Sequence, residues 1–579
     1  MLVACVLHHC AAAQPRPEAV GEAELLLEIK RAWGDPPVLA AWSASSSAAG
    51  AHCRWPYVRC DSAGRVTRLA LDNTDVAGPI PNAIGNLSGL VYLDLFNNSI
   101  VGAFPTVLYR CRSLRYLSLS ENYLGGELPD DIGHGFATNM STLDLSGNYF
   151  NGSIPTSLSM LRNLRHLVLD NNRLIGTIPV ELSELTSLQT LWLAYNWFSP
   201  SELPASFKNL NNLVSLSVAN CSLIGNFPSY VVKMPKLEGL DLSSNSLTGS
   251  IPLGIWRLKK LQYLWVSDNK LTGKLVVDGF AAKRLTIIDL SENNLNGTIP
   301  EVFGRLQKLE YLVLSSNNFS GEIPTSISQL PSLIGLSLEE SRLTGTLPYE
   351  LGNHSPALSL VGVGDNELTG RIPERLCAGG QLSWFNASNN RLNGSIPVSL
   401  ASCASLQYLV LDNNQLSGLA TLNLRNNKLS GSGNNLNGTI PASLSKLQNL
   451  QYLALDNNIL TGTIPMELGE MTSLQKLSLW NNTFNADGCN LIGDFPSYVV
   501  RMSELVELGL SYNLLTGSIH PGVWGLKKLQ QLDVSRDNLT GGIVVCSFAA
   551  TSLTMVDVSY NHLTGVIPEV LGTWRTSLT

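Results

Sequence analysis

The chain repeats one phrase of about two dozen residues along nearly its whole length. Residues 237–252, LEGLDLSSNSLTGSIP, show the phrase in full as L-x-x-L-x-L-x-x-N-x-L-x-G-x-I-P. The same frame recurs at residues 90–105, 164–179, 309–324 and 450–465, and about 20 copies can be counted, some of them degraded. Because one such unit is too small to bury its own apolar side chains, the copies must stack on one another in a solenoid.

Each position of the phrase has a structural reason. Alternation along a short strand sends Leu240 and Leu242 inward and turns the residues between them outward. Asn245 follows where the strand turns, and its amide can pair with backbone groups of neighbouring coils. Gly249 permits a tight backbone path, and Pro252 opens the return limb. The strands are therefore expected to form one parallel sheet whose outward residues line a concave face.

This phrase is the pattern of a leucine-rich repeat, and the period of about 24 residues with the G-x-I-P ending resembles the plant-specific class of these repeats. The resemblance implies an α/β repeat fold, namely a right-handed superhelical solenoid with a second, small sheet beside the main one.

Residues 22–65 are predicted to form an N-terminal cap, which an exposed solenoid end needs because the first coil has no upstream neighbour. A helical stripe of apolar residues ends at Gly34 and Pro36 and consists of Leu26, Ile29, Ala32 and Trp33. A disulfide between Cys53 and Cys60 would tie this small segment down.

The other cysteines are spread through the repeats. Cys377 and Cys403 lie about one repeat apart, so they either bridge adjacent coils or stay reduced. Buried free thiols at core positions are expected for Cys111, Cys221, Cys489 and Cys546.

The start of the chain, residues 1–13, reads MLVACVLHHCAAA and resembles a secretory signal peptide, although a truncated start is the alternative. No run of 18 apolar residues occurs, so the sequence predicts no membrane-spanning helix. We expect a glycoprotein that is secreted or held at the cell surface.

A long internal duplication is visible at an offset of 489 − 221 = 268 residues, where 51 of 84 aligned positions from Cys221 to Gly304 are identical to those from Cys489 to Gly572. The repeat rhythm stumbles just before the second copy, with landmark asparagines at Asn414, Asn427 and Asn434. We therefore predict a first arm over 66–431, a second, partly duplicated arm over 432–579 without a C-terminal cap, and a bulge or loop at 418–434 between them.

Several classes of function find no support in the sequence. The net charge is −7 with 14% charged residues, which gives no electrostatic case for nucleic-acid binding. The motifs H-E-x-x-H, G-x-x-x-x-G-K-[ST] and C-x-x-C are absent, and so are the kinase motifs H-R-D and D-F-G. The histidines are scattered singly. We predict a protein that is not an enzyme and that holds no metal or cofactor.

The outward positions beside the framework leucines are acidic with aromatic residues among them, a composition typical of a surface that binds a peptide with apolar and basic groups. A consensus role in solvent is the alternative for any single Asp. The predicted ligand-binding residues are Trp192, Tyr195, Tyr263, Trp265, Asp268, Asp289, Glu292, Glu339 and Glu340.

Asn-x-Ser/Thr sequons are frequent, partly because the repeat consensus generates them. The glycosylation candidates are Asn86, Asn97, Asn139, Asn151, Asn296, Asn318, Asn353, Asn393, Asn437 and Asn538. A glycan on the further sequon Asn386 would block the concave face.

Segments outside the repeat framework carry a closer resemblance. LLLEIKRAWGDPPVLAAW (residues 25–42) and CRWPYVRC (53–60) resemble the N-terminal cap of plant leucine-rich-repeat receptor-like kinases. LWLAYNWF (191–198), FPSYVVKMPKLE (227–238) and ERLCAGGQL (374–382) are similar to the HAESA-like branch.

The family implies an extracellular sensor at the plasma membrane that binds a short secreted peptide on its concave face and recruits a smaller leucine-rich-repeat co-receptor kinase. Such receptors often hold the peptide carboxylate with an Arg-x-Arg pair on a distal strand, where this chain offers Arg425 alone. The alternatives are a secreted leucine-rich-repeat inhibitor of wall-degrading enzymes and a non-functional, truncated duplicate of a receptor kinase that has lost its kinase part.

Overall fold

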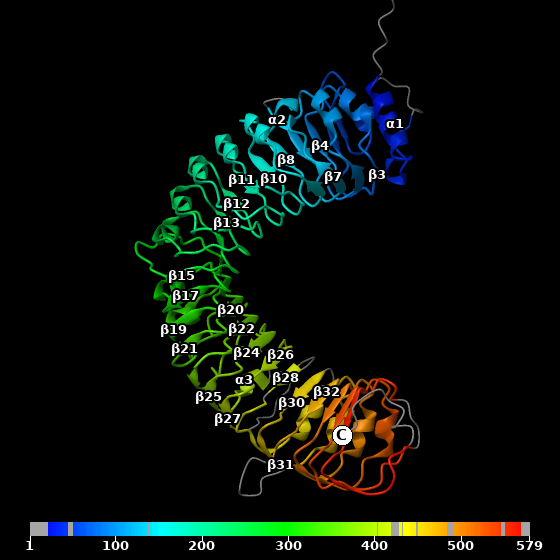
Figure 1. Ribbon diagram of the computed structural model, residues 1–579, viewed down its shortest axis with the longest axis vertical. Helices are drawn as coiled ribbons and strands as arrows, with labels where there is room; N and C mark the ends of the chain where they lie inside the picture. Colours follow the sequence, from blue (N-terminus) through cyan, green and yellow to red (C-terminus); the bar gives the residue numbers. More distant parts are fainter. Residues whose placement is uncertain are drawn as a thin grey trace, which may run out of the picture. The chain divides into compact units, whose positions relative to one another are not determined.

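The computed structural model describes residues 21–568 except 44–49, 137–138, 402, 404, 418–427, 431, 447–449, 483–490 and 546–549. The predicted signal peptide at 1–13 lies outside these residues. The chain divides into two compact units, Met1–Leu223 and Ile224–Thr579, and each is described by itself. Within each unit the strands follow one another in chain order (Figure 1). The predicted leucine-rich-repeat solenoid is confirmed.

The first unit begins with the predicted cap. Helix α1 (Glu22–Ala32) buries Leu25, Leu26 and Ile29, whereas Ala32 is exposed, so the predicted stripe is wrong at that position. Leu25, next to Leu26, lies on the buried side of the helix in place of Ala32. Strand β1 (Val58–Cys60) pairs antiparallel with β2 (Val66–Ala70), the first strand of the main ladder.

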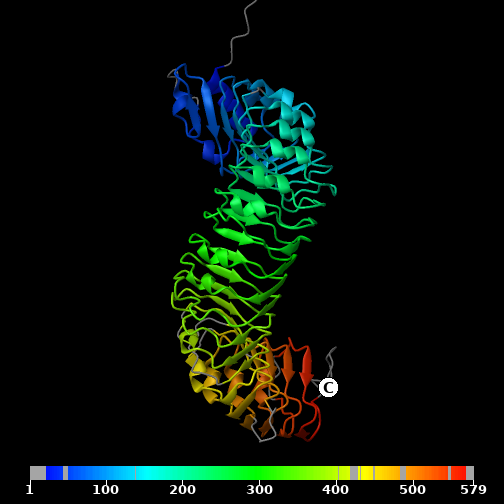
Figure 2. The same ribbon diagram turned by 90° about the vertical axis from the view of Figure 1, so that its left-hand side faces the viewer.

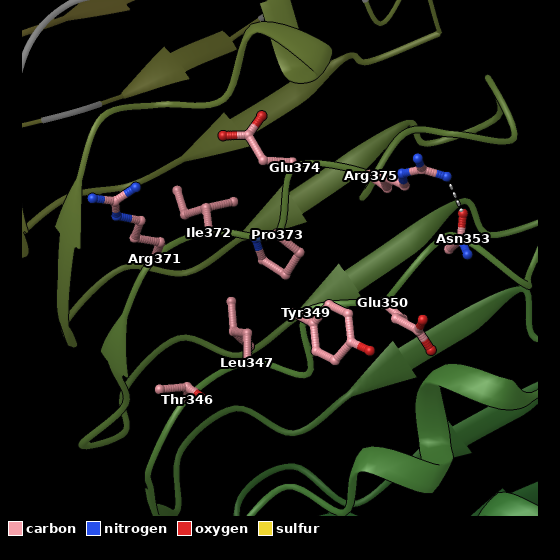
Figure 3. A pocket seen from close by; sticks show the side chains of 10 residues that line it. All are labelled: Thr346, Leu347, Tyr349, Glu350, Asn353, Arg371, Ile372, Pro373, Glu374 and Arg375. Carbon is pink, nitrogen blue, oxygen red and sulfur yellow. Dashed lines mark hydrogen bonds between the residues drawn. The ribbon is translucent and has the colours of Figure 1, made fainter.

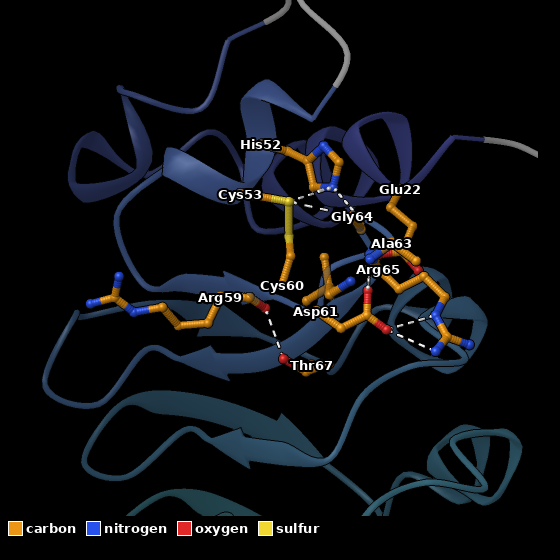
Figure 4. Close-up of a disulfide and its surroundings, with 11 residues drawn as sticks. Glu22, His52, Cys53, Arg59, Cys60, Asp61, Ala63, Gly64, Arg65 and Thr67 are labelled. Atoms are coloured by element: carbon orange, nitrogen blue, oxygen red, sulfur yellow. Dashed lines mark hydrogen bonds and ion pairs between the residues drawn. A yellow bond between two sulfur atoms is a disulfide. The ribbon is translucent and has the colours of Figure 1, made fainter.

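A disulfide between Cys53 and Cys60 closes the cap, as predicted (Figure 4). Next to it the Arg65 guanidinium forms an ion pair with Asp61 at 2.8 Å, and Thr67 Oγ1 donates to the Arg59 carbonyl at 3.3 Å. The backbone N–H of Val66 donates to the Glu22 carboxylate, so the first helix is fastened to the first strand. The cap therefore covers the open edge of the solenoid with bonds of its own.

The main ladder is parallel and in register from coil to coil, with the framework Leu of each strand opposite the next. In the first unit it continues through β4 (Tyr92–Asp94), β6 (Tyr116–Ser118), β8 (Thr142–Asp144), β10 (His166–Val168), β11 (Thr190–Trp192) and β12 (Ser215–Ser217). In the second unit it runs through β13 (Gly239–Asp241), β14 (Tyr263–Trp265), β16 (Ile287–Asp289), β18 (Tyr311–Val313), β20 (Gly335–Ser337), β22 (Leu360–Gly362), β24 (Trp384–Asn386), β26 (Tyr408–Val410), β28 (Lys428–Ser430), β30 (Tyr452–Ala454), β32 (Lys476–Ser478), β34 (Glu507–Gly509), β36 (Gln531–Asp533) and β38 (Met555–Asp557). Figure 2 shows the strands of this unit lying one above another.

The predicted second sheet is also confirmed, as short parallel ladders beside the main one. Its strands are β3 (Ala77–Gly78), β5 (Ser99–Gly102), β7 (Tyr123–Glu127) and β9 (Tyr149–Asn151) in the first unit, and β15 (Thr272–Lys274), β17 (Asn294–Gly297), β19 (Asn318–Glu322), β21 (Arg342–Thr344), β23 (Thr369–Gly370), β25 (Arg391–Gly394), β27 (Gln415–Leu416), β29 (Asn437–Thr439), β31 (Ile459–Thr463), β33 (Leu491–Asp494), β35 (Leu514–Thr516), β37 (Thr540–Gly541) and β39 (His562–Leu563) in the second. We call the outward surface of these strands the side face, and that of the main ladder the strand face.

The return limbs are mostly single 3-10 turns, because a Pro before most of these turns fixes the entry of the chain and leaves room for little more than one turn per coil. Two short helices, α2 (Ile132–Gly135) and α3 (Val398–Ala401), replace such turns. The 3-10 turns are η1 (Pro37–Leu39), η2 (Ala51–Arg54), η3 (Asn82–Asn86), η4 (Thr106–Arg110), η5 (Thr156–Met160), η6 (Val180–Glu184), η7 (Ala205–Asn209), η8 (Ser229–Lys233), η9 (Leu253–Arg257), η10 (Glu301–Arg305), η11 (Thr325–Gln329), η12 (Ala442–Lys446), η13 (Met466–Glu470), η14 (Ser497–Arg501) and η15 (Pro521–Gly525).

The framework leucines stack in buried columns between the strands and the turns, and a row of buried asparagines runs along the edge of these columns. Asn122 shows the pattern: its Nδ2 donates to the Leu95 and Leu119 carbonyls at 2.9 and 3.1 Å, and its Oδ1 accepts from the Ile100 N–H at 2.9 Å. Each Asn thus satisfies buried backbone groups of two coils, as the sequence predicts. In the coil where Cys221 replaces Asn, its thiol lies 3.2 Å from the Leu193 carbonyl.

Most of the segment 418–434, where a bulge or loop is predicted, lies outside the described residues, but the main ladder continues through its described part. Strand β28 pairs in register with β26 and β30, and Asn434 takes the ladder place after Asn414, accepting from the Leu416 N–H and donating to the Leu411 carbonyl. The segment KLSGSGN, residues 428–434, supplies the x-L-x-L-x-x-N frame with Gly431 in the second Leu place, so one coil of 434 − 414 = 20 residues replaces the two expected short ones. Asn427, the expected landmark, lies in 418–427, outside the described residues. The two predicted arms, 66–431 and 432–579, stay a prediction from the duplication.

Candidate ligand-binding face

The residue before each framework position lies in the left-handed backbone region, with φ between +49° and +57° for the non-glycine residues from Asn97 to Tyr560. Asn and Asp adopt this conformation at little cost, whereas other L-residues pay about 1–2 kcal/mol for it. Most coils have Asn, Asp or Ser there. Gly147 and Gly433 hold the position in two coils, and the remaining exceptions are Glu121, Tyr195, Glu292, Glu340, Tyr512, Arg536 and Tyr560. Residues kept at a conformational cost point to a role at the surface, and three of them are predicted site residues.

Two predicted residues belong to the first unit. Trp192 ends strand β11 and is exposed, with its indole N–H donating to Ser215 Oγ at 2.8 Å on the next coil. Tyr195 follows three residues later in the left-handed position and is also exposed. The fold therefore presents both rings to solvent on the strand face.

Strand β14 of the second unit carries two further predicted residues on the same side. The rings of Tyr263 and Trp265 stack with their centroids 5.2 Å apart and their planes 2° from parallel. Trp265 lies opposite Asp289 of β16 in the register. One Asp289 oxygen accepts from both the backbone N–H and the hydroxyl of Ser291, at 3.1 and 2.6 Å. Asp289 therefore caps its own turn, which agrees with a consensus role for this carboxylate.

The acidic residues farther along the second unit form a row on successive coils. Glu340 accepts from Ser316 Oγ at 2.8 Å, while Asp268 and Glu292 are exposed in the equivalent left-handed positions. Glu339 accepts from Ser337 Oγ at 2.7 Å and from Asn386 Nδ2, two coils away, at 3.4 Å. Its carboxylate lies over Gly362, where an added Cβ would come within 2.3 Å of it. Glu339 is thus held flat against the strand face.

Beside Glu339 the strand face is hollowed by about 450 Å³. The hollow exists because β20 and β22 put glycines outward: a Cβ at Gly335 would meet the Tyr311 ring at 2.7 Å, and Gly362 leaves room for Glu339. Its lining, in chain order, is Tyr311, Val313, Gly335, Leu336, Ser337, Glu339, Leu360, Ser383, Trp384, Gln407 and Tyr408. Glu339 is the one carboxylate among these residues, and none of them is basic, so an apolar hollow carries a single negative charge.

The structure therefore brings Glu339 into the hollow but leaves Trp192, Tyr195, Tyr263, Trp265, Asp268, Asp289, Glu292 and Glu340 out of its lining. Sequence reasoning missed Leu360, Trp384 and Tyr408. The signal that would find them is one register position that carries a glycine, Gly335, among large residues on the neighbouring strands, namely Tyr311, Leu360, Trp384 and Tyr408.

A second, larger hollow of about 630 Å³ lies on a return limb (Figure 3). Asn353 lies at its border, and its Oδ1 accepts from Arg375 Nη1 at 3.0 Å. Asn353 is half-buried, whereas the other nine predicted glycosylation sites are exposed. The Ser355 hydroxyl of its sequon is fully buried and donates to the Leu330 carbonyl at 2.7 Å. A glycan on Asn353 would therefore have to be attached before this coil folds.

The cysteines divide as follows. Cys377 is joined to Cys403, the pairing that their spacing left open, while Cys111 and Cys221 are buried free thiols. Burial raises the pKa of the Cys111 thiol to about 12, so it is unreactive at neutral pH. His52 lies near Cys53 and Cys60, but the disulfide leaves no thiolate there to ligate a metal. Cys489 and Cys546 lie outside the described residues.

Among the helices of the described residues, none is both long and apolar enough to cross a membrane.

Comparisons with known proteins agree with this architecture. Family models for "Leucine rich repeat" match residues 113–134, 139–161, 163–185, 211–271, 283–343, 449–471 and 552–574, and a "Leucine rich repeat N-terminal domain" matches 21–61. A curated relative, polygalacturonase inhibitor 1 of Oryza sativa subsp. japonica, is 40% identical over 74 residues, which are 13% of this chain and 21% of the inhibitor. The chain thus matches about a fifth of the length of that relative.

Two solved structures match nearly end to end. The ectodomain of the Arabidopsis receptor kinase HAESA, in complex with an N-terminally extended IDA peptide hormone, aligns with a TM-score of 0.89 at 33% identity over 96% of this chain and 92% of that one. HAESA in complex with IDA and the co-receptor SERK1 aligns with a TM-score of 0.83 at 31% identity over 95% and 96% of the two chains. The repeat solenoid, its disulfide-closed cap and these matches show that the chain belongs to the leucine-rich-repeat ectodomains of the plant receptor-like kinases.

Proposed function

We propose that this chain is an extracellular peptide-recognition module, secreted or held at the cell surface, whose strand face in the second unit binds a short secreted peptide. By analogy with HAESA, which was solved with IDA and SERK1, the loaded module would recruit a leucine-rich-repeat co-receptor kinase. The module has no catalytic role of its own in this proposal, since recognition requires only a rigid, pre-organised surface.

The observation that carries the proposal is the hollow beside Glu339. Small ligands bind in concave, mostly apolar sites with few polar groups that fix their orientation, and aromatic walls supply most of the contact energy. Here Trp384 and Tyr408 provide the walls, and Glu339 provides the single charge. The ligand that complements this site carries an apolar group next to a basic one.

The predicted residues Glu292, Glu340 and Asp268 extend the negative charge along neighbouring coils of the second unit. They would attract further basic groups of the same peptide and raise its association rate. Trp192 and Tyr195 stay proposed ligand contacts on the strand face of the first unit.

A direct test uses synthetic peptides of one length with a constant Leu-Trp core flanked by Lys, Gln or Glu, titrated into the secreted full chain by calorimetry. We expect the order Lys, Gln, Glu from tightest to weakest, and a loss of about tenfold for the Lys peptide with Glu339→Gln or Trp384→Ala. Tyr349→Ala, an exposed tyrosine at the return-limb hollow, is the matched control and should change nothing. An unchanged affinity in both hollow variants would overturn the site.

The rival function, inhibition of wall-degrading enzymes, rests on the match to the rice polygalacturonase inhibitor, which spans only 74 residues. Addition of the chain to a polygalacturonase assay separates the two, because an inhibitor would lower the rate without any peptide. The truncated, ligand-free duplicate predicts no binding of any of the three peptides.

A further inference from the structure

The side face of the first unit carries a row of large side chains that the repeat does not require. Tyr123, Tyr149, Arg173 and Trp197 occupy the same position of four consecutive coils, directly after the framework asparagines. At that position six consecutive coils of the second unit have Lys270, Asn294, Asn318, Arg342, Glu367 and Arg391, and later coils include Ile459 and Leu514. Because both units form the same solenoid with either set, the aromatic row is not needed for folding.

The four side chains form one continuous stack. The rings of Tyr123 and Tyr149 lie 6.1 Å apart and 21° from parallel. The Arg173 guanidinium lies 4.5 Å from the Tyr149 centroid and 5.6 Å from that of Trp197. Strands β7 and β9 pair on one side of Tyr149 and the coil of Arg173 follows on the other, so both faces of the Tyr149 ring are covered.

The stack is nevertheless open to solvent along its outer edge. Tyr123, Tyr149 and Trp197 are 53%, 41% and 65% exposed. Val101 and Ile175 lie beside them and are also exposed. Apolar side chains gathered in this way are unusual on a surface that meets only water and mark interaction sites. Tyr, Trp and Arg are also the residues that carry most of the energy in protein interfaces.

The kind of partner can be inferred from the chemistry of the side chains in the stack. An aromatic ring is negative over its faces and positive at its edge, and here the faces are used within the stack. What points outward is therefore a set of positive ring edges with the charge of Arg173 among them. Arg173 has no ion-pair partner within the part of the chain that the structure describes, and Glu127, the carboxylate on β7, lies opposite Asn151, away from Arg173.

Carbohydrate is the less suitable partner, because a sugar packs its C–H groups on the face of a ring. The covered faces of Tyr149 leave no such platform in the middle of the row. A protein segment that combines apolar side chains with carboxylates would pack on the ring edges and pair with Arg173 at the same time.

We propose that the stack Tyr123–Tyr149–Arg173–Trp197 is a second docking surface, for a partner protein segment rich in acidic and apolar residues. Its preference is opposite to that of the strand face, whose hollow carries a carboxylate. The surface does not depend on the proposed peptide function, since none of its residues lies on the strand face.

The test uses the Glu and Lys peptides with the Leu-Trp core, titrated into the secreted full chain. Every protein in the comparison carries Asn151→Gln, because a glycan on this side-face sequon would border the stack. We expect the Glu peptide to lose about tenfold in affinity with Arg173→Glu and with Tyr149→Ser, while Arg173→Lys retains most of the affinity.

Arg342→Glu is the matched control, since Arg342 holds the same repeat position on the polar side face of the second unit. It should leave the Glu peptide unaffected, and thermal unfolding should be the same in all these surface variants. Binding of the Glu peptide that Arg173→Glu and Tyr149→Ser both leave intact would overturn the proposal.

Two other outcomes would replace the partner. If an acidic oligosaccharide such as oligogalacturonate bound through the stack and the Glu peptide did not, the surface would be a carbohydrate site. Self-association of the chain that Tyr149→Ser abolishes, measured by sedimentation, would instead assign the stack to a second copy. Either result contradicts an acidic protein segment as the occupant.

Discussion

The side face of the first unit and the strand face of the second are built on the same repeat but present opposite chemistry. The side face projects ring edges and the charge of Arg173, whereas the strand face encloses an apolar hollow with the carboxylate of Glu339. The buried leucines and asparagines beneath them are interchangeable from coil to coil.

The difference shows which positions of the repeat determine the fold and which determine binding. Framework positions determine the backbone, and their spacing determines which outward positions of neighbouring coils become adjacent. Two outward glycines on adjacent strands leave space at the hollow, and four large residues at one repeat position of consecutive coils create the stack. A binding surface is therefore a property of several coils at one position, not of any single repeat.

The largest effect we predict concerns the framework that both faces share. Asn390→Leu would leave the Leu368 N–H without its acceptor and would take one of two Asn donors from each of the Val363 and Ala387 carbonyls. Asn122→Leu would do the same in the first unit, where the Ile100 N–H loses its acceptor. We expect each to cost about 2–4 kcal/mol, because a buried N–H loses its partner and two buried carbonyls each lose one of two hydrogen bonds. Urea unfolding followed by circular dichroism measures this.

Glu339→Gln and Arg173→Glu are the controls for the framework variants, and each should stay within about 0.5 kcal/mol of wild type. If a face variant destabilised the chain as much as a framework variant, the separation of stability from recognition would be wrong.

A second prediction concerns Asp537, which stands where the ladder has Asn. Its Oδ1 accepts from the Leu515 N–H at 2.9 Å, but its buried Oδ2 has no hydrogen-bond partner in the structure. Burial, with a smaller contribution from the charge of Asp533, raises the pKa of Asp537 from 3.8 to about 7. Between about pH 4 and 7 the folded chain therefore holds a proton that the unfolded chain has lost, so stability falls as pH rises through this window.

Asp537→Asn should remove this dependence and stabilise the chain by about 1–2 kcal/mol at pH 8, with little gain at pH 4. Asn513→Asp, one coil earlier, should act in the opposite direction at pH 8. Thermal unfolding of both variants at the two pH values is the measurement. An equal gain for Asp537→Asn at pH 4 and pH 8 would exclude the proton as its cause.

A third prediction sharpens the contrast in charge. Glu339→Lys should lower the affinity for the Lys peptide by about tenfold and raise the affinity of the strand face for the Glu peptide. Both wild-type interactions should weaken as salt is raised, because each relies on a partly exposed charge. Titrations at low and high salt test this, with Arg342→Glu as the variant that should behave like wild type. Weaker binding of the Lys peptide with no gain for the Glu peptide would mean that Glu339→Lys had collapsed the hollow instead of recharging it.

The strands and the buried core could be predicted from the repeat spacing, because the spacing leaves only one arrangement in which Leu240, Leu242 and Asn245 all point inward. The coil that ends at Asn434, between the two predicted arms, could not be predicted in this way. Two overlapping frames fit the sequence there, one ending at Asn427 and one at Asn434, and only pairing of Leu429 with Leu409 and Leu453 selects the second. The hollow was missed for a related reason, since the role of Gly335 is visible only once the register puts it between Tyr311 and Leu360.

The smallest expected effect tests the aromatic residues outside both surfaces. Trp192 and Trp265 are proposed peptide contacts, but neither lines the hollow, and the Trp265 ring is already stacked on Tyr263. We expect Trp192→Ala and Trp265→Ala, made separately, to weaken the Lys peptide by no more than about threefold, since most contacts around an interface centre contribute little. Thermal unfolding should not change, because both rings are surface groups. The loss of affinity for the Lys peptide in Trp384→Ala, measured in the same titration, is the reference for these two losses. A loss at Trp265 as large as that at Trp384 would move the centre of the site four coils toward β14 and make the acidic row, not the hollow, its main determinant.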